Sequence, residues 1–201
     1  MNESKAIAFF DFDGTITNRD IFWDYLFYRF KIGLSPLKIV TCIPAFILYL
    51  MKVWNNEKAK QIIFSQLFKG EPVDYFKITI QQYYKNDFLK RVKKDALNKI
   101  LWHKNSNHKV YIVSANFDLI LNKFARENQI ELLATQVAVE NNIITGKFAT
   151  ANCYGMEKVN RIKNAVLDLS SYTQIYAYGD SKGDLEMLGL ATEKFYCFFK
   201  K

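Results

Sequence analysis

Two aspartates, Asp11 and Asp13, stand two residues apart directly after a short apolar run, Ala6–Phe10. The run has the composition of a strand buried on both faces, so Asp11 is expected at its carboxyl end, with Asp13 pointing the same way. Two carboxylates this close repel each other unless a positive group lies between them. Gly14 permits a sharp turn, and Thr15 offers an anion a hydroxyl and a backbone N–H. The stretch predicts a site for a divalent cation and a phosphate; the alternative is an acidic turn after an edge strand.

Other polar residues fall at equivalent places further along the chain. Ser114 follows the apolar run 109–113, and Asp180 follows the run 174–178. Lys158 lies near the start of a predicted helix. Because ligands of open parallel sheets bind at the carboxyl ends of the strands, these side chains are expected to meet. Together with the two aspartates they would supply a nucleophile, a proton shuttle, metal ligands, a hydroxyl and a cation.

The elements that must position these residues alternate between strand and helix, apart from one long helical block. No strand pattern appears between Thr15 and about Asn107. The pattern predicts an α/β fold, a doubly wound, mostly parallel sheet with a Rossmann-like core (1–16 and 104–201), and an inserted all-helical cap (17–103). Predicted helices cover 20–30, 39–51, 56–68, parts of 72–103, 117–128, 157–169 and a stretch from 184. Predicted strands cover 109–113, 174–178 and 195–199, and 132–139 is predicted to form a hairpin with 143–148.

Within the predicted cap, residues 39–51 carry no charge. At about 1.5 Å per residue this run is too short to cross a bilayer core of roughly 30 Å. Two interpretations stay open. In one, the run is a buried helix of the cap, bent at Pro44. In the other, it is an interfacial helix that brings the protein to lipid, with Tyr49 and Trp54 near the headgroups.

The net charge of +8 suits an acidic partner such as a phosphorylated small molecule or an anionic lipid surface. Nucleic acid is disfavoured because no basic stretch with interleaved aromatics and no DNA-binding motif occurs. Cys42, Cys153 and Cys197 are far apart, which favours a reducing, cytoplasmic compartment over disulfides or structural zinc. The N-terminus shows no signal-peptide pattern, so a cytoplasmic protein is expected, with peripheral membrane contact as an option. His103 and His108 are expected to be solvated surface imidazoles.

Four motifs resemble those of the haloacid dehalogenase superfamily of phosphatases and occur in the same order. Residues 11–15, Asp-Phe-Asp-Gly-Thr, resemble its first motif, and Ser114 resembles its second. Lys158 resembles its third, and residues 179–184, Gly-Asp-Ser-Lys-Gly-Asp, its fourth. The helical insert lies where members with a cap between the first and second motifs carry it. The pattern is most similar to the phosphoserine-phosphatase-like subgroup, which includes phosphatidylglycerophosphatase-like enzymes with apolar caps.

The resemblance, together with the chemistry, implies a role for each residue. Asp11 would attack phosphorus and form an aspartyl-phosphate, while Asp13 would act as general acid and then general base. Mg²⁺ would be held by Asp11, by the backbone carbonyl of Asp13 and by Asp180, with Asp184 and Ser181 in supporting positions. The residues expected to bind the phosphate are Gly14, Thr15, Ser114, Ala115, Asn116 and Lys158.

The sequence departs from phosphoserine phosphatases in the residues that would choose the substrate. Asp20 lies where those enzymes place an acidic residue that meets the substrate amino group, but the cap offers no clear carboxylate-binding arginine; Arg19 and Arg29 are nearest. Ser114-Ala115-Asn116 also replaces a Ser-Gly-Gly turn. The apolar insert favours a phosphate with an apolar body, such as a lipid phosphate. The alternatives are a small soluble phosphate such as phosphoserine, a phosphotransferase, and a non-catalytic phosphate-binding or membrane-interaction module.

Overall fold

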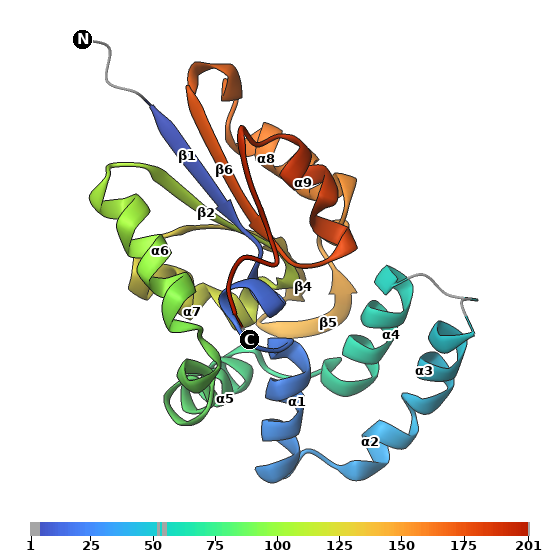
Figure 1. Cartoon of the computed structure of the whole chain (residues 1–201). Coiled ribbons are helices and arrows are strands. Elements are labelled where there is room, and N and C mark those ends of the chain that lie inside the picture. Colours follow the sequence, from blue (N-terminus) through green and yellow to red (C-terminus); the bar gives the residue numbers. More distant parts are fainter. Residues whose placement is uncertain (1–4, 52, 54–55, 201) are drawn as a thin grey trace.

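The computed structural model of the chain describes residues 5–51, 53 and 56–200. Its main sheet has five parallel strands in the order β3-β2-β1-β6-β7, and Figure 1 shows them running toward a group of helices. The strands are β1 (Ala6–Phe10), β2 (Lys109–Phe117), β3 (Glu131–Thr135), β6 (Gln174–Gly179) and β7 (Glu193–Tyr196). The chain winds from β1 outward in both directions, so the predicted doubly wound parallel sheet is confirmed.

Helices cover both faces of this sheet. Side chains of β1 alternate between two cores: Ala8 and Phe10 belong to one, and Ile7 and Phe9 to the other. Because all four are completely buried, β1 is the central strand that its composition predicted. The first face is covered by α6 (Lys94–Asn105) and α7 (Asp118–Asn128), and the second by α8 (Met156–Ala165) and α9 (Leu185–Gly189).

The chain leaves β1 through a single wide turn, η1 (Phe12–Ile16), which is closed by a hydrogen bond from the Thr17 N–H to the Phe12 carbonyl (3.0 Å). It returns from the helical insert beside the same point. There the Asn18 N–H donates to the Arg91 carbonyl (2.9 Å), and the Lys93 N–H donates to the Ile16 carbonyl (2.9 Å). The two crossings between sheet and insert are therefore hydrogen bonded to each other.

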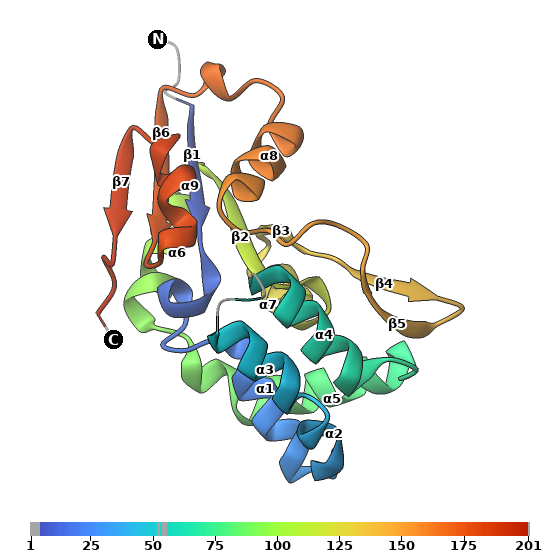
Figure 2. The ribbon, with the colours of Figure 1, turned by 90° about the vertical axis from the view of Figure 1, so that its right-hand side faces the viewer.

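The insert begins with α1 (Ile21–Lys31), α2 (Pro36–Val40), α3 (Ile43–Leu50), α4 (Asn56–Phe68) and α5 (Val73–Asn86), followed by the short turn η2 (Phe88–Arg91) (Figure 2). Its interior is aromatic. Tyr25 packs against Phe76 and Tyr83, and Phe64 packs against Phe68, with ring centroids 5.1–5.4 Å apart. Such contacts let α1, α4 and α5 form one apolar core that continues to the sheet through Phe117.

The uncharged run 39–51 does not form the single bent helix that we predicted. The chain breaks at Thr41–Cys42, between α2 and α3, and Pro44 lies in the first turn of α3, where proline is tolerated. The prediction of a buried helix is wrong for most of the large side chains of this run. Val40, Ile47 and Leu50, for example, are about half exposed or more. Trp54 and the side chain of Tyr49 lie outside the described residues. Within the described part of the chain, no helix has the length and apolar character needed to span a membrane.

Several predicted boundaries in the second half of the chain are wrong. Residues 132–139 are not one strand: β3 joins the main sheet and ends at Thr135, and only β4 (Val137–Glu140) forms the hairpin with β5 (Ile143–Phe148). That hairpin reaches the insert, where the Gly70 N–H donates to the Ile144 carbonyl (2.9 Å). The helix predicted for 157–169 ends at Ala165, and the last strand is β7, earlier than the predicted 195–199.

The prediction of solvated imidazoles is wrong for His103, which is 0% exposed. Its Nδ1 lies 2.8 Å from Nδ1 of His108, and its Nε2 lies 2.9 Å from the hydroxyl of Tyr178. Burial, together with the charges of His108 and Lys99, lowers the pKa of His103 to about 3. The ring is therefore a neutral part of the core between α6 and the sheet.

Candidate active site

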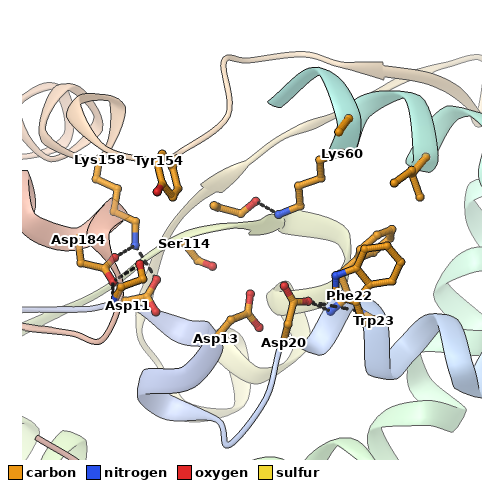
Figure 3. Close-up of a pocket in the computed structure, with 14 residues that line it drawn as sticks. Asp11, Asp13, Asp20, Phe22, Trp23, Lys60, Ser114, Tyr154, Lys158 and Asp184 are labelled. Atoms are coloured by element: carbon orange, nitrogen blue, oxygen red, sulfur yellow. Dashed lines mark hydrogen bonds and ion pairs between the residues drawn. The ribbon is translucent and has the colours of Figure 1, made fainter. Parts of the chain in front are cut away.

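A pocket of about 320 Å³ lies at the carboxyl ends of the strands, between the sheet and the helical insert (Figure 3). Its wall on the sheet side is polar, and its wall on the insert side is largely apolar. The first wall consists of Asp11, Asp13, Ser114, Ala115, Tyr154, Lys158, Ser181 and Asp184, and the second of Asp20, Phe22, Trp23, Ala59, Lys60 and Ile63. Eight of the residues predicted from the sequence thus line a single pocket; Gly14, Thr15, Asn116 and Asp180 lie beside it.

The buried ammonium of Lys158 joins two carboxylates of the pocket. Its Nζ lies 2.5 Å from Asp11 Oδ1 and 2.6 Å from Asp184 Oδ1, and it also donates to the Val113 carbonyl (2.8 Å). Burial raises the pKa of Asp11 to about 7. The negative charge of Asp184 also raises this pKa, whereas the positive charge of Lys158 lowers it. The pKa of Asp184 is lowered, because Lys158 and Ser181 outweigh the effect of its burial.

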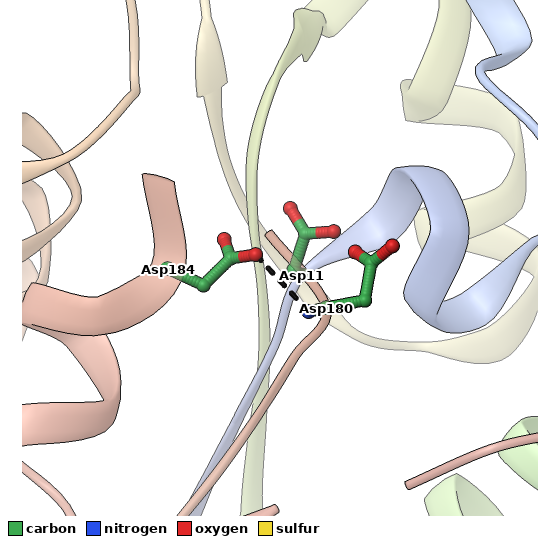
Figure 4. Close-up of side chains that lie close together, drawn as sticks. All are labelled: Asp11, Asp180 and Asp184. Atoms are coloured by element: carbon green, nitrogen blue, oxygen red, sulfur yellow. Dashed lines mark hydrogen bonds between the residues drawn. The ribbon is translucent and has the colours of Figure 1, made fainter. Parts of the chain in front are cut away.

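Asp11, Asp180 and Asp184 form a carboxylate cluster in which one oxygen of each lies within 4.8 Å of the others (Figure 4). Asp180 fits only because residue 14 is glycine: φ there is +86°, and a Cβ would lie 2.1 Å from Asp180 Oδ2. Both oxygens of Asp184 already accept hydrogen bonds, from Lys158 and from the N–H and hydroxyl of Ser181. A cluster of hard oxygen donors suits Mg²⁺, and Asp11 and Asp180 are the carboxylates best placed to bind it.

The Asp13 carboxylate points away from this cluster, toward the insert. Its Oδ1 accepts the N–H of Ile21 (2.8 Å), and the side-chain amide of Asn116 donates to both of its oxygens (3.2 and 2.9 Å). Burial raises its pKa well above the ordinary value, and the charge of Asp20 raises it further. The raised pKa favours the protonated form of Asp13, which is the form that a general acid requires.

The predicted phosphate-binding residues are arranged by an irregularity in β2. The pairing of β2 with β3 shifts between Ser114 and Phe117, so Ala115 and Asn116 bulge from a strand that is longer than predicted. The Ser114 hydroxyl lies in the pocket and also accepts the Asn116 N–H (3.0 Å). The Thr15 hydroxyl donates to Asp180 Oδ1 (3.2 Å), which supports the carboxylate cluster.

Lys60 is a pocket residue that the sequence analysis missed. It extends from α4 across the pocket, and its ammonium donates a short hydrogen bond to the Ala115 carbonyl. Burial lowers its pKa, whereas the carboxylates of Asp20 and Asp13 raise it. In the sequence it is one of two lysines on an amphipathic helix, and only the packing of α4 over the sheet distinguishes it.

The residues considered for substrate choice have clear structural partners. Asp20 caps α1, accepting the N–H groups of Phe22 (2.9 Å) and Trp23 (3.3 Å), and it also lines the pocket. Arg29 is buried in a two-pronged ion pair with Glu71 (2.8 and 2.7 Å) inside the insert. Arg19 pairs with Asp24. Lys60 is thus the cation that the insert contributes to the pocket lining.

Comparisons with known proteins agree with this architecture. The model of the family described as haloacid dehalogenase-like hydrolase matches residues 8–189. Protein CicA of Caulobacter vibrioides is 31% identical over 202 residues, covering all of this chain and 89% of that protein. A solved protein of unknown function from Bordetella pertussis Tohama I has a TM-score of 0.82 at 18% identity, with 94% of this chain and 88% of that chain covered. A substrate-bound phosphoserine phosphatase has a TM-score of 0.65 at 19% identity, with 98% and 87% covered.

At these identities the solved structures support the fold alone, whereas the family model spans the pocket residues from Asp11 to Asp184. The chain belongs to the haloacid dehalogenase-like hydrolase family.

Proposed function

We propose that the protein is a Mg²⁺-dependent phosphomonoesterase that works through an aspartyl-phosphate formed on Asp11. The observation that carries this proposal is the position of Asp11 at the end of β1, where it faces the pocket and lies 2.5 Å from a buried ammonium. A carboxylate held in this way can attack a phosphorus atom, and the covalent step divides one hydrolysis into two displacements.

The other residues on the sheet side supply the remaining steps. Lys158 and Ser114 bind the phosphoryl oxygens and neutralise charge as the P–O bond breaks. Asp13 protonates the leaving alkoxide, and its carboxylate then takes a proton from the water that attacks the aspartyl-phosphate. The raised pKa of Asp13 fits the first of these roles.

The groups that would hold Mg²⁺ are Asp11, Asp180 and the backbone carbonyl of Asp13. Asp184 and Ser181 would orient these ligands. When bound, the ion supplies positive charge that lets an anionic carboxylate approach an anionic phosphate. The carboxylate cluster and the glycine that makes room for Asp180 support this assignment.

We propose that residues 17–93 of the predicted cap (17–103) select the substrate over a core formed by 1–16 and 104–201. The remaining residues, 94–103, belong to α6, which lies against the sheet with the core. The favoured substrate is a phosphate with an apolar body, such as a phosphatidylglycerophosphate-like lipid phosphate met at the inner face of the membrane. Phe22, Trp23 and Ile63 on the cap side of the pocket support this choice, as do the exposed apolar side chains of α2 and α3.

A small soluble phosphate such as phosphoserine is the second candidate, and one observation favours it. Asp20 and Lys60 both line the pocket on the cap side, so opposite charges are available for an amino group and a carboxylate. Lys60 would bind the carboxylate in place of an arginine, since Arg19 and Arg29 are paired with Asp24 and Glu71.

The reaction is tested by phosphate release from p-nitrophenyl phosphate with Mg²⁺ and with EDTA. We expect metal-dependent turnover that Asp11→Asn abolishes without changing the fold; turnover by that variant would refute the assignment of the nucleophile. Parallel assays with phosphatidylglycerophosphate and O-phosphoserine, with and without anionic vesicles, test the substrate. Hydrolysis of O-phosphoserine without activity on the lipid would refute the lipid proposal. Binding to vesicles without any turnover would instead indicate a non-catalytic module.

A further inference from the structure

A second cavity, of about 170 Å³, opens inside the helical insert. It lies between α1, α4 and the segment that contains α2 and α3. Seven side chains line it, and none of them is charged: Trp23, Leu26, Ile39, Cys42, Ile43, Ile63 and Leu67. We call this cavity the apolar groove.

The apolar groove adjoins the candidate active site, because Trp23 of α1 and Ile63 of α4 line both cavities. A ligand that passes between these two side chains would extend from the catalytic carboxylates into the groove.

The spacing of residues on α1 and α4 gives this passage a gradient of polarity. Asp20, the N-cap of α1, is followed at intervals of three residues by Trp23 and Leu26, so the three side chains lie on the same side of the helix. Along α4, Lys60 in the pocket is followed by Ile63 and then Leu67 at helical spacing. The side chains that each helix contributes to the two cavities are thus charged near Asp11 and Asp13 and apolar farther along the helix.

We infer that the apolar groove binds an unbranched hydrocarbon chain of the substrate while its phosphate lies against Asp11. The inference rests on the proposed phosphomonoesterase activity and adds where the apolar body is bound. The ends of the passage match the two ends of such a molecule: a cationic, metal-binding end for the phosphate, and an uncharged end for the chain. Ile39 and Ile43 of the α2–α3 segment would cover the chain, and they are 37% and 47% exposed.

Monomeric n-alkyl phosphates, from methyl to octyl, test the inference directly. We expect kcat/KM to rise two- to fourfold with each added methylene until the groove is filled; fourfold corresponds to about 0.8 kcal/mol per buried CH₂. The same kcat/KM for methyl and octyl phosphate would overturn the inference. Failure to hydrolyse methyl and p-nitrophenyl phosphate would instead count against the proposed function, so the two failures are distinguishable.

Two isoleucines one turn apart on α3 provide matched variants. Ile43 lines the groove and is 47% exposed, whereas Ile47 does not line it and is 48% exposed. We expect Ile43→Asp to lower kcat/KM for octyl phosphate about tenfold and to leave methyl phosphate unchanged, and Ile47→Asp to change neither. Equal loss in both variants would overturn the groove assignment. Losses confined to vesicle-bound substrate in both variants would also overturn it, by indicating that α3 contacts a bilayer.

Discussion

The side-chain amide of Asn116 lies against both carboxylate oxygens of Asp13, with Nδ2 2.9 Å from Oδ2 and 3.2 Å from Oδ1. The two residues are 103 positions apart, and the bulge in β2 brings them together. Asn116 occupies the place where the resemblance led us to expect a glycine. The departure from the family pattern therefore adds a contact that orients the proposed general acid.

We predict that Asn116→Ala lowers kcat for an alkyl phosphate by about tenfold to a hundredfold, because a mobile Asp13 protonates the leaving group less effectively. The loss should be smaller for p-nitrophenyl phosphate, whose leaving group needs little protonation. Steady-state kinetics on both substrates, with KM and kcat separated, make the comparison. Equal losses on the two substrates would mean that Asn116 supports the pocket in some way other than through Asp13.

Replacing Lys158 should destabilise the metal-free protein, because the carboxylates of Asp11 and Asp184 would lose a buried partner at 2.5 and 2.6 Å. Without metal, we expect Lys158→Met to lower the free energy of unfolding by about 3–5 kcal/mol. We expect Mg²⁺ to raise the free energy of unfolding by more in this variant than in the wild type. Urea unfolding with Mg²⁺ or EDTA measures both effects. Lys163→Met, at an exposed position on the same helix, is the matched control. A Mg²⁺ effect no larger than in the wild type would contradict the assignment of this cluster.

The meeting of Asp11, Ser114 and Lys158 could be expected from the sequence, because the carboxyl ends of neighbouring parallel strands share one edge of the sheet. Buried strands such as β1 are marked by continuous apolar composition, which local sequence shows well. The break between β3 and β4 could not be foreseen, since both halves have strand-like composition and only the packing of the hairpin against α4 separates them.

Contacts between segments distant in sequence account for the residues that were misjudged or missed. Lys60 resembles any solvated lysine until α4 is placed over Ala115. His103 resembles a surface residue near a loop until α6 lies against the sheet and Tyr178 meets its ring. In both cases the deciding partner comes from another element, so the local pattern carries no signal for it.

Mg²⁺ binding should depend on pH through Asp11, whose folded-state pKa of about 7 lies above the ordinary value of 3.8. The metal-free folded protein holds this proton more tightly than the unfolded chain does, so its stability falls as the pH rises from 3.8 toward 7. Mg²⁺ requires the deprotonated carboxylate. We therefore expect its affinity to weaken about tenfold per pH unit below pH 7 and to level off above it, as measured by calorimetry. Asp11→Asn should flatten the profile, and an unaltered profile in that variant would exclude Asp11 as the group responsible.

The buried His103 should make the fold sensitive to mild acid. Its pKa is lowered to about 3 from an ordinary 6.5, so the unfolded chain takes up a proton that the folded protein excludes. The stabilisation is complete above pH 6.5 and is lost as the pH falls below it. The ring of His103 contacts His108, Tyr176 and Tyr178. The charge of Lys99 also lowers its pKa. We expect the free energy of unfolding in urea to fall less steeply between pH 7 and pH 5 in His103→Gln than in the wild type. Parallel slopes for the two proteins would show that the folded protein takes up a proton on His103 as readily as the unfolded chain does, which would contradict the lowered pKa.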